Sequence, residues 1–508
     1  LWIPRNPLAR AEGIDEAADA PLTYLQHEMG GEAADIRLQT FLRYGPEMVE
    51  FFHQRTAVQF LSGSAMPDFH PSPGAANGGR SVTAQPYDGR LLGDWLHRLR
   101  PPLETISLGG MGIAGGADMA HFFNATRSPR SALYAARRLL RHGWQRLRAG
   151  RGQHLVNGNA LVARLLRSAL DAGVRFQLNA PVVRLLQGPP GVSGAVLRSD
   201  GGEIHVEAGA VVLACGGFPH DRQRLAQVVP HAAEGYGHFS AAPPDNQGEG
   251  IRLGESVGGQ FDTSLRHPLA WAPVSRVTLA SGQQLMFPHL VERAKPGVIA
   301  VLPNGKRFVN EADSYHDFIA ALLAATPAGD TPQAWLLADR RALRRYGLGH
   351  ARPFPFTPTA WLRTGYLQRG NTLAELAKQC AIDANALAET VERFNHFASA
   401  GEDVDFHRGA SAYNRAQGDH QVTLGPLREG PFYAVRILPG SLGTFSGLQT
   451  DEHARVLDEQ QLPIPGLYAI GNDMSSVMRG YYPSGGITLG PAMTFGYLVG
   501  KGLIKKQI

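Results

Sequence analysis

The chain has 508 residues, of which 43% are hydrophobic, and this length is enough to bury a large core in about two to four domains. Its two cysteines, Cys215 and Cys380, are too few for a disulfide scaffold or a cysteine metal site and suit a reducing compartment, so we expect a cytoplasmic protein. The net charge is only +5, and no apolar run reaches the roughly 18 residues that span a bilayer, so no transmembrane helix is expected.

The positive charge is concentrated in residues 119–170, which hold ten arginines and no acidic residue. A solvated helix face is the simplest interpretation, and a membrane-surface patch or an anion site are the alternatives. Nucleic-acid binding is not expected, because aromatic residues are not interleaved with these arginines as stacking platforms.

In chain order, the first third is predicted to be mainly helical. Residues 14–60 read as helices because apolar residues recur at helical spacing, and residues 131–148 and 158–172 show the same pattern. Between them, the Pro- and Gly-rich residues 66–93 predict a long loop over a site.

Strand patterns follow. Residues 174–186 predict a strand pair that turns at Asn179, and residues 194–206 predict a second hairpin that turns at the Asp-Gly-Gly of 200–202. The apolar run 208–214 predicts a buried strand, and residues 248–257 predict a helix.

The glycines Gly110, Gly112 and Gly115 match the spacing of a dinucleotide fingerprint. That fingerprint also needs a buried strand before it and an acidic residue about 20 positions later. Residues 104–108 make a poor strand, and Asp118 follows too closely. We therefore expect an ordinary loop here.

Residues 268–438 differ in character from what precedes them. Short strands such as 297–302 alternate with charged helices such as 372–381 and 383–398, which indicates an inserted domain. Strand and loop patterns return at 432–455.

The stretch 466–500 combines a strand, a polar turn, a glycine turn and a helix in close succession. An apolar strand (467–470) ends in Gly471-Asn472-Asp473, and a turn at Ser484-Gly485-Gly486 opens an apolar helix at about residue 488. The unpaired N–H groups and the dipole at a helix start stabilise negative charge, as on an electron-rich ring. An ordinary strand-to-helix turn is the alternative.

Two tyrosines are candidate catalytic groups. Tyr482 precedes Gly486 by four residues, and Tyr315 follows a probable strand and turn. A phenol polarises a carbonyl or, when ionised, accepts a proton, although packing with a satisfied hydroxyl is the commoner role. The 19 histidines show no metal-ligand spacing, and no Ser-His-Asp set is evident.

Four motifs carry a resemblance to a known family. They are LACGGFPHD (213–221), RFVNEADSYHDF (307–318), LPGSLGTFSGLQTDEHARVLD (438–458) and the stretch 466–500. In this order they resemble the flavoprotein superfamily of fumarate reductases, and within it the 3-ketosteroid Δ1-dehydrogenase branch. The likeness extends over essentially the whole chain.

The resemblance implies an α/β fold in which a doubly wound FAD-binding domain is built from two pieces, 1–265 and 439–508. A catalytic or capping α+β domain, 266–438, is expected between them. The family opens with a strand and a glycine turn, whereas this chain opens with Leu1-Trp-Ile-Pro-Arg-Asn, which resembles the segment after them. We therefore expect the first piece to lack its N-terminal βαβ unit.

The resemblance also implies residue roles. Tyr482 and the Gly486 N–H match the pair that holds the 3-keto oxygen, and Tyr315 is similar to the tyrosine base. The expected contacts of a non-covalently bound FAD are Val182, Ala214, Cys215, Gly216, Gly471, Asn472, Gly486, Ile487 and Leu489; no metal is expected. Phe69 stands where the family has a tyrosine that assists the base, and His70 or Tyr87 are candidates to replace it.

The expected function is that of an FAD-dependent dehydrogenase that introduces a C=C bond next to a ring ketone, with a 3-ketosteroid as the expected substrate. The implied partners are a lipophilic cyclic ketone, a quinone or other electron acceptor, and a peripheral membrane contact, with no nucleic acid. A fumarate-reductase-like reductase of an activated alkene is one alternative, although the run 440–447 and the Tyr482 loop depart from the dicarboxylate enzymes. A non-catalytic membrane-surface protein is the other.

Overall fold

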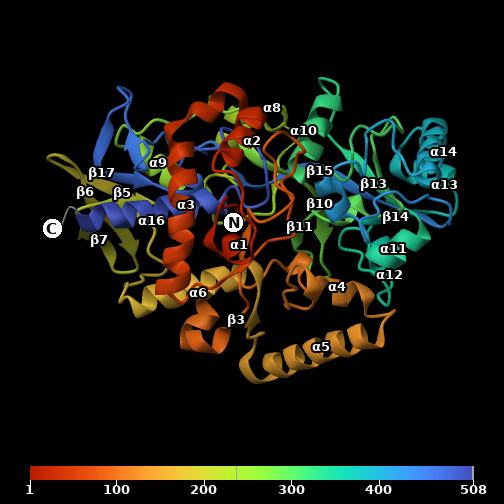
Figure 1. Ribbon diagram of the computed structural model, residues 1–508, viewed down its shortest axis with the longest axis horizontal. Coiled ribbons are helices and arrows are strands. Elements are labelled where there is room, and N and C mark those ends of the chain that lie inside the picture. Colours follow the sequence, from red (N-terminus) through yellow and green to blue (C-terminus); the bar gives the residue numbers. More distant parts are fainter. Residues whose placement is uncertain (236, 506–508) are drawn as a thin grey trace.

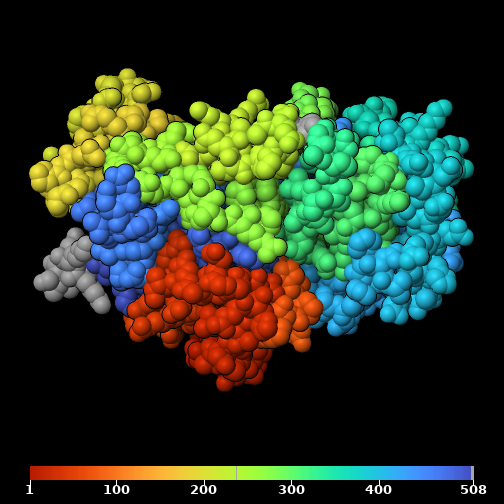
Figure 2. Space-filling model, turned by 90° about the horizontal axis from the view of Figure 1, so that it is seen from above, coloured from red at the N-terminus to blue at the C-terminus, as the bar shows by residue number. Residues whose placement is uncertain are grey.

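The computed structural model describes residues 1–235 and 237–505 and shows a mixed helix-and-sheet fold that is longer in one direction than in the others (Figures 1 and 2). One end of the long axis carries a three-stranded antiparallel sheet of β5 (Val182–Gly188), β6 (Gly191–Ser199) and β7 (Gly202–Glu207). The other end carries the helices α13 (Leu373–Cys380) and α14 (Ala384–Ala400).

A seven-stranded sheet occupies the middle of the molecule, and β15 (Phe432–Thr444) is its hub. β15 pairs antiparallel with β10, β13 and β14 and parallel with β9. Neighbours cover most of its length, so its residues are almost continuously buried. The other strands are β9 (Phe239–Ser240), β10 (Leu269–Thr278), β11 (Gln284–Pro288), β12 (Val298–Val301), β13 (Ala334–Ala338) and β14 (Leu367–Gly370).

A smaller sheet joins the two halves of the sequence. Its order is β16 (Arg455–Leu457), β17 (Pro463–Ala469) and β8 (Val211–Leu213), and β8 runs parallel to β17. The prediction of a buried strand at 208–214 is wrong in part, because β8 is an edge strand of this sheet and Val212 is 38% exposed.

The helical N-terminal region packs against the end of the chain. The helices predicted in residues 14–60 are confirmed by α2 (Ala20–Met29), η1 (Gly30–Ala34) and α3 (Ile36–Arg55), and α1 (Pro7–Ala11) precedes them. α3 contacts α16 (Leu489–Lys505). Figure 2 shows this N-terminal part beside the C-terminal part. The loop predicted at 66–93 follows β1 (Phe60–Ser62), and its first half is confirmed. Its second half instead contains β2 (Val82–Ala84), β3 (Tyr87–Asp88) and the start of η2 (Gly89–Arg98).

The arginine-rich region forms helices, as predicted. α4 (Ala117–Asn124), α5 (Pro129–Ala149), β4 (His154–Leu155) and α6 (Asn157–Asp171) follow one another along one side of the molecule in Figure 1. The glycine spacing at 110–115 lies in a loop between η3 (Glu104–Ile106) and α4, with no strand before it among residues 99–109. No helix of the described residues is long and apolar enough to cross a bilayer.

Of the two predicted hairpins, the second is confirmed and the first is wrong. β6 and β7 turn between Ser199 and Gly202, as the Asp-Gly-Gly run predicts. Residues 174–181 form no strand, and Val174 and Leu178 are about half exposed, since nothing covers their apolar side chains. β5 instead pairs with β6, which shows that an apolar alternation needs a packing partner to become a strand.

The remaining helices lie in the central and second half of the chain. The predicted helix at 248–257 is α9 (Glu249–Glu255), and α13, α14 and β12 confirm the helices and strand expected in residues 297–398. The other helices are α7 (Arg222–Val228), α8 (Pro230–Ala233), η4 (Glu292–Ala294), α10 (Tyr315–Ala325), α11 (Arg340–Tyr346), α12 (Thr359–Arg363), α15 (Ala412–Gln417) and η5 (Gly471–Asp473).

Candidate active site

The two candidate catalytic tyrosines meet although 167 residues separate them in the sequence. Tyr315 is the first residue of α10, whose N-cap Ser314 accepts a hydrogen bond from the Asp317 N–H. Tyr482 lies in the loop that leads to Gly486. The Tyr315 hydroxyl donates to the Tyr482 oxygen at 2.7 Å, so the hydroxyl hydrogen of Tyr482 is free for a different acceptor.

Aromatic rings enclose this pair. Phe69 stacks on Tyr482 with ring centroids 5.7 Å apart, and it meets Tyr315 edge-on at the same distance. Phe445 covers Tyr482 from another side. Burial raises the pKa of Tyr482 to about 12, and burial and the neighbouring Tyr482 raise the pKa of Tyr315 well above its usual value. Both phenols are therefore neutral hydrogen-bond donors at neutral pH.

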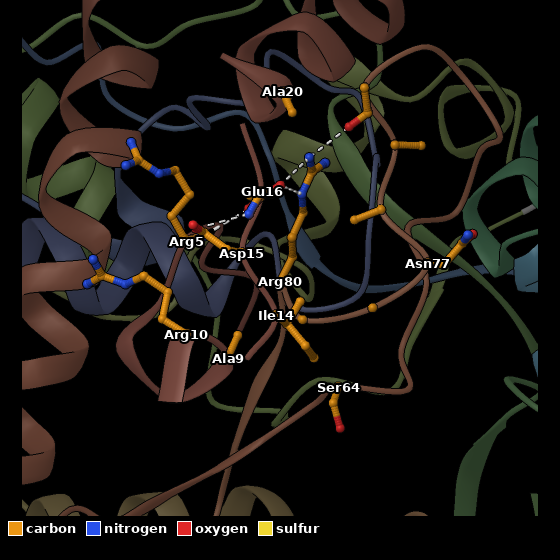
Figure 3. A pocket seen from close by; sticks show the side chains of 15 residues that line it. Arg5, Ala9, Arg10, Ile14, Asp15, Glu16, Ala20, Ser64, Asn77 and Arg80 are labelled. Carbon is orange, nitrogen blue, oxygen red and sulfur yellow. Dashed lines mark hydrogen bonds and ion pairs between the residues drawn. The ribbon is translucent and has the colours of Figure 1, made fainter. Parts of the chain in front are cut away.

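A buried ion pair fixes the loop that carries Phe69. The Asp68 carboxylate accepts hydrogen bonds from Trp2 Nε1 at 2.8 Å and from Arg80 at 2.7 Å. Arg80 reaches Glu16 at 2.6 Å, and Figure 3 shows this pair beside a cavity of about 430 Å³. The Phe69 N–H donates to the Pro483 carbonyl at 3.0 Å, so Phe69 is tied to the segment that carries Tyr482.

Neither residue that the sequence offers in place of a second phenol takes that position. His70 lies between Glu28 at 2.5 Å and Asp317 at 2.8 Å. Although burial acts in the opposite direction, these two carboxylates raise the pKa of His70 to about 10, so it is a structural cation. Tyr87 belongs to β3 and faces Arg164, whose guanidinium lies 5.1 Å from its ring centroid.

Tyr413 is a third phenol at the site, and sequence reasoning missed it. Tyr413 lies on α15, and the centroid of its ring is 4.5 Å from that of Phe69. Burial raises the pKa of Tyr413. The neighbouring Asn414 donates to Asp313 and accepts from Asn310, each at 2.9 Å, which fastens α15 to the loop before Tyr315. A lone tyrosine in a short helix gives no sequence signal for such a position. Phe69, Tyr315, Tyr413 and Tyr482 are called the phenol site below.

Two buried ring N–H groups near the phenol site have no hydrogen-bond partner in the described part of the chain. They are Trp271 Nε1 and His316 Nε2. The Nδ1 of His316 accepts from the Trp271 backbone N–H at 3.2 Å and burial lowers the pKa of His316 to about 3, so the proton of the neutral ring is assigned to Nε2. The His316 ring lies 5.3 Å from Tyr482. Buried donors are normally satisfied, so these two indicate a ligand.

The candidate FAD contacts gather where β8 and β17 end. The Asp473 carboxylate accepts from the backbone N–H groups of Cys215 at 2.5 Å and Gly217 at 2.9 Å, which holds the two strand ends together. Ala214, Cys215 and Gly216 follow β8. Gly471, Asn472 and Ile487 line a narrow cavity with Thr444 and Phe445, beside the start of α16.

Gly486 cannot be exchanged for a larger residue without strain. Its φ is +99°, and a Cβ there would lie 2.8 Å from the backbone of Leu1 and Trp2. Leu489 begins α16 and is 49% exposed, and Val182 begins β5 and is 37% exposed. The structure thus brings most of the candidate contacts to one edge, while Val182 lies on the separate sheet of β5–β7.

These residues suit a flavin. The glycines at 471, 485 and 486, the polar Asn472 side chain and the start of α16 offer backbone N–H groups to an electron-rich ring. The described residues hold no cluster of histidine, cysteine and acidic side chains that is arranged as a metal site.

Comparisons with known proteins agree with this reading. The family model described as FAD binding domain matches residues 1–489. The chain is 38% identical to a 4-oxocyclohex-2-ene-1-carboxylate 5-dehydrogenase of Sinomonas cyclohexanicum, over 98% of this chain and 85% of that protein. It is 34% identical to a 3-oxosteroid 1-dehydrogenase of Mycolicibacterium smegmatis, over 98% and 88%.

Among solved structures, the fold matches the 3-ketosteroid Δ1-dehydrogenase from Sterolibacterium denitrificans in complex with 1,4-androstadiene-3,17-dione. The TM-score is 0.89 and the identity 35%, over 100% of this chain and 91% of that one. These matches confirm the predicted resemblance and the cofactor FAD. The chain belongs to the FAD binding domain family, and it is an FAD-dependent oxidoreductase.

Proposed function

We propose that the protein introduces a C=C double bond next to a ring ketone, with 3-ketosteroids as the leading substrate class. The observation that carries the proposal is the buried, hydrogen-bonded pair of Tyr315 and Tyr482 beside the glycine start of α16. The names of the relatives at 34–38% identity describe this type of reaction on ring ketones.

Each phenol has a distinct task in this reaction. The Tyr482 hydroxyl and the Gly486 N–H donate to the ketone oxygen, which acidifies the adjacent C–H. Tyr315, as its phenolate, takes that α-proton. A bound FAD would supply the hydride acceptor for the neighbouring carbon, so the two hydrogens would leave the substrate as a proton and a hydride. The enclosing rings of Phe69 and Phe445 exclude water from the transfer.

A second candidate substrate is an oxocyclohexane carboxylate. The relative at 38% identity acts on an oxocyclohexene carboxylate, according to its name. Trp271 Nε1–H and His316 Nε2–H, both buried and unpartnered among the described residues, would serve a second oxygen on the ring. A carboxylated monocycle carries such an oxygen close to the ketone, whereas a steroid carries it at the far end of four rings.

The proposed domain division keeps the FAD domain in two pieces, 1–265 and 439–508, around a catalytic domain of 266–438. The parallel pairing of β8 with β17 supports it, because these strands come from the two pieces. β15 extends across residue 438, so one strand would belong to both domains. A structure with bound FAD and substrate tests this division: it fails if the 266–438 segment supplies most of the FAD contacts.

The proposed membrane contact is made by α5. Four large apolar side chains lie on one stripe of this helix and are more than half exposed: Leu133, Leu140, Trp144 and Leu147. Arg137, Arg141 and Arg148 flank the stripe and have no acidic partner in the described structure. This pattern is typical of interfacial helices. A cavity of about 1060 Å³ borders α5 at His142 and Arg146 and suits the entry of a lipophilic ketone. A quinone, which also resides in membranes, is the proposed electron acceptor.

A panel assay tests the proposed function. The purified protein, loaded with FAD, is supplied with a dye acceptor and with 3-ketosteroids, oxocyclohexane carboxylates and fumarate as an oxidant control. We expect dye reduction together with a ketone product that is two hydrogens lighter. If neither class of ring ketone is desaturated while fumarate is reduced by a chemical donor, the reductase alternative is correct instead.

A further inference from the structure

A cluster of arginines surrounds a cavity of about 550 Å³ between the end of α4 and α11. Five guanidinium groups line it: Arg127, Arg340, Arg341, Arg344 and Arg345. Glu429 is the acidic residue among those that line it. Arg345 joins the two elements, because it donates to the Phe123 carbonyl at 3.2 Å and to Asn124 Oδ1 at 3.1 Å. Figure 1 shows α4 and α11 on the same side of the molecule.

The acidic groups nearby do not neutralise these cations. Arg340 pairs with Glu429 at 3.2 Å, and Arg341 shares that carboxylate at 3.9 Å and reaches Asp339 at 3.8 Å. Arg345 pairs with Asp419 at 3.2 Å. Arg127 and Arg344 have no acidic partner in the described part of the chain. Five guanidinium groups therefore face three carboxylates, which leaves a local excess of positive charge.

Two of these cations, Arg344 and Arg345, are held in place. The Arg344 guanidinium lies 4.6 Å from the centroid of the Phe354 ring, and the Phe354 N–H donates to the Arg344 carbonyl at 3.0 Å. The Arg345 side chain is 10% exposed, so its charge is preorganised. Phe122, Phe123 and Pro353 give the same cavity an apolar wall.

We infer that this cavity binds a phosphate group carried on a larger, partly apolar molecule. A planar guanidinium group can donate two parallel hydrogen bonds to two oxygens of one phosphate, and the apolar wall accommodates the remainder of the ligand. The phosphate has two sources, a membrane phospholipid or a soluble phosphate ester. Arg127 lies two residues before α5, the helix with the exposed apolar stripe, so a lipid headgroup is within reach of the same surface.

Calorimetric titration with pyrophosphate tests the site directly. The test variant is the double substitution Arg127→Gln with Arg344→Gln, and the control is Arg175→Gln with Arg222→Gln, two exposed arginines outside the cavity. Both variants lose the same charge. We expect affinity in the test variant to fall about tenfold or more and in the control to stay within about twofold, because a charge-assisted hydrogen bond to phosphate is lost only in the first.

Vesicle sedimentation distinguishes the two sources. Vesicles of phosphatidylcholine with one-fifth phosphatidic acid are used at low salt. A fall in vesicle binding for the test variant beyond that of the control assigns the site to a lipid headgroup. Weaker pyrophosphate binding with vesicle binding equal to the control assigns it to a soluble phosphate ester. If the test and control variants lose equal affinity in both assays, or the wild-type protein binds neither ligand, the inference is overturned. Unfolding temperatures of both variants verify that the fold is intact.

Discussion

The phenol site and helix α5 differ in how they treat polar and apolar groups. At the phenol site, hydroxyl groups are buried and bonded to one another, and rings cover them. Along α5, leucines and a tryptophan are exposed, while Arg137, Arg141 and Arg148 beside them have no acidic partner among the described residues. A buried polar group is retained at a cost in stability, and an exposed apolar stripe at a cost in solubility. We propose that the buried phenols serve catalysis and that the exposed stripe of α5 serves membrane binding. Variants in the two regions should therefore have separable effects.

The largest effect is expected for Tyr315→Phe. Removing the base should lower kcat by about 10³–10⁴-fold while FAD content stays unchanged, since general-base catalysis contributes on this scale. It should also abolish exchange of the substrate α-proton with solvent, a step that needs no hydride transfer. NMR in D₂O without an electron acceptor measures that exchange. If the variant keeps both exchange and turnover, Tyr315 is not the base.

Tyr482→Phe should have the next largest effect. Removing one preorganised donor to a developing oxyanion costs about 10²–10³-fold in rate. The Gly486 N–H remains, so the loss should be smaller than for Tyr315→Phe. Stopped-flow reduction of the bound flavin by substrate measures this step. A change confined to KM would show that Tyr482 only binds the ketone.

The pH dependence follows from the direction of the Tyr315 pKa. Burial and the neighbouring Tyr482 raise this pKa, so the phenolate is the minor form at neutral pH. The phenolate fraction, and with it kcat/KM, should therefore rise about tenfold per pH unit between about pH 6 and pH 9. A profile that is flat in this range, measured with a substrate that has no ionisable group, would contradict a buried tyrosine base.

Tyr413 and Phe69 offer a smaller and reversible effect. We propose that Tyr413 supports the Tyr315 phenolate from across Phe69, so Tyr413→Phe should lower kcat by up to about tenfold, the value of one neutral hydrogen bond. Adding Phe69→Tyr to this variant should restore part of the rate, because it returns a phenol to the same cluster. Tyr87→Phe is the matched control and should leave the rate unchanged. No recovery in the double variant would remove Tyr413 from the mechanism.

The smallest effect on turnover is expected at α5. Leu140→Glu with Leu147→Glu should leave kcat for a water-soluble ring ketone unchanged, because both side chains are exposed and remote from the phenols. Binding to anionic vesicles should fall by about tenfold or more, because two apolar contacts are lost and two negative charges that repel the anionic surface are added. Equal vesicle binding by variant and wild type would show that the stripe is not a membrane contact.

Much of the fold was predictable because it rests on local patterns. The spacing of apolar residues predicts α3, α5 and α14, and a turn dipeptide predicts the β6–β7 hairpin. The prediction of a strand pair at 174–186 was wrong because strand formation depends on the neighbouring strand. Residues 174–181 form no strand, and β5 pairs with β6 instead. The edge position of β8 likewise depends on sheet order, which no window of residues contains.

The candidate site was predictable where a motif carries it. Tyr315 and Tyr482 lie in motifs with turn and cap residues around them, and the structure joins them at 2.7 Å. Tyr413, Trp271 and His316 depend on packing between distant segments, so their position could not be inferred from spacing. The position of His70 between Glu28 and Asp317 could not be inferred either, because both carboxylates are distant from it in sequence.

The bond between Asp473 and the Cys215 N–H spans 258 residues, and the bond between the Trp2 N–H and the Gly486 carbonyl joins the two ends of the chain. A nascent chain that reaches only residue 450 therefore holds the helices of the N-terminal region but lacks Gly471, Asn472 and Gly486. Loop closure over such separations is slow relative to local folding. The N-terminal helices should therefore form with the face that α16 later covers still exposed, so assembly of the candidate FAD contacts should be a late step in folding. Removal of α16 would then leave Gly471, Asn472 and Gly486 in the chain but uncover the face of α3 that α16 contacts.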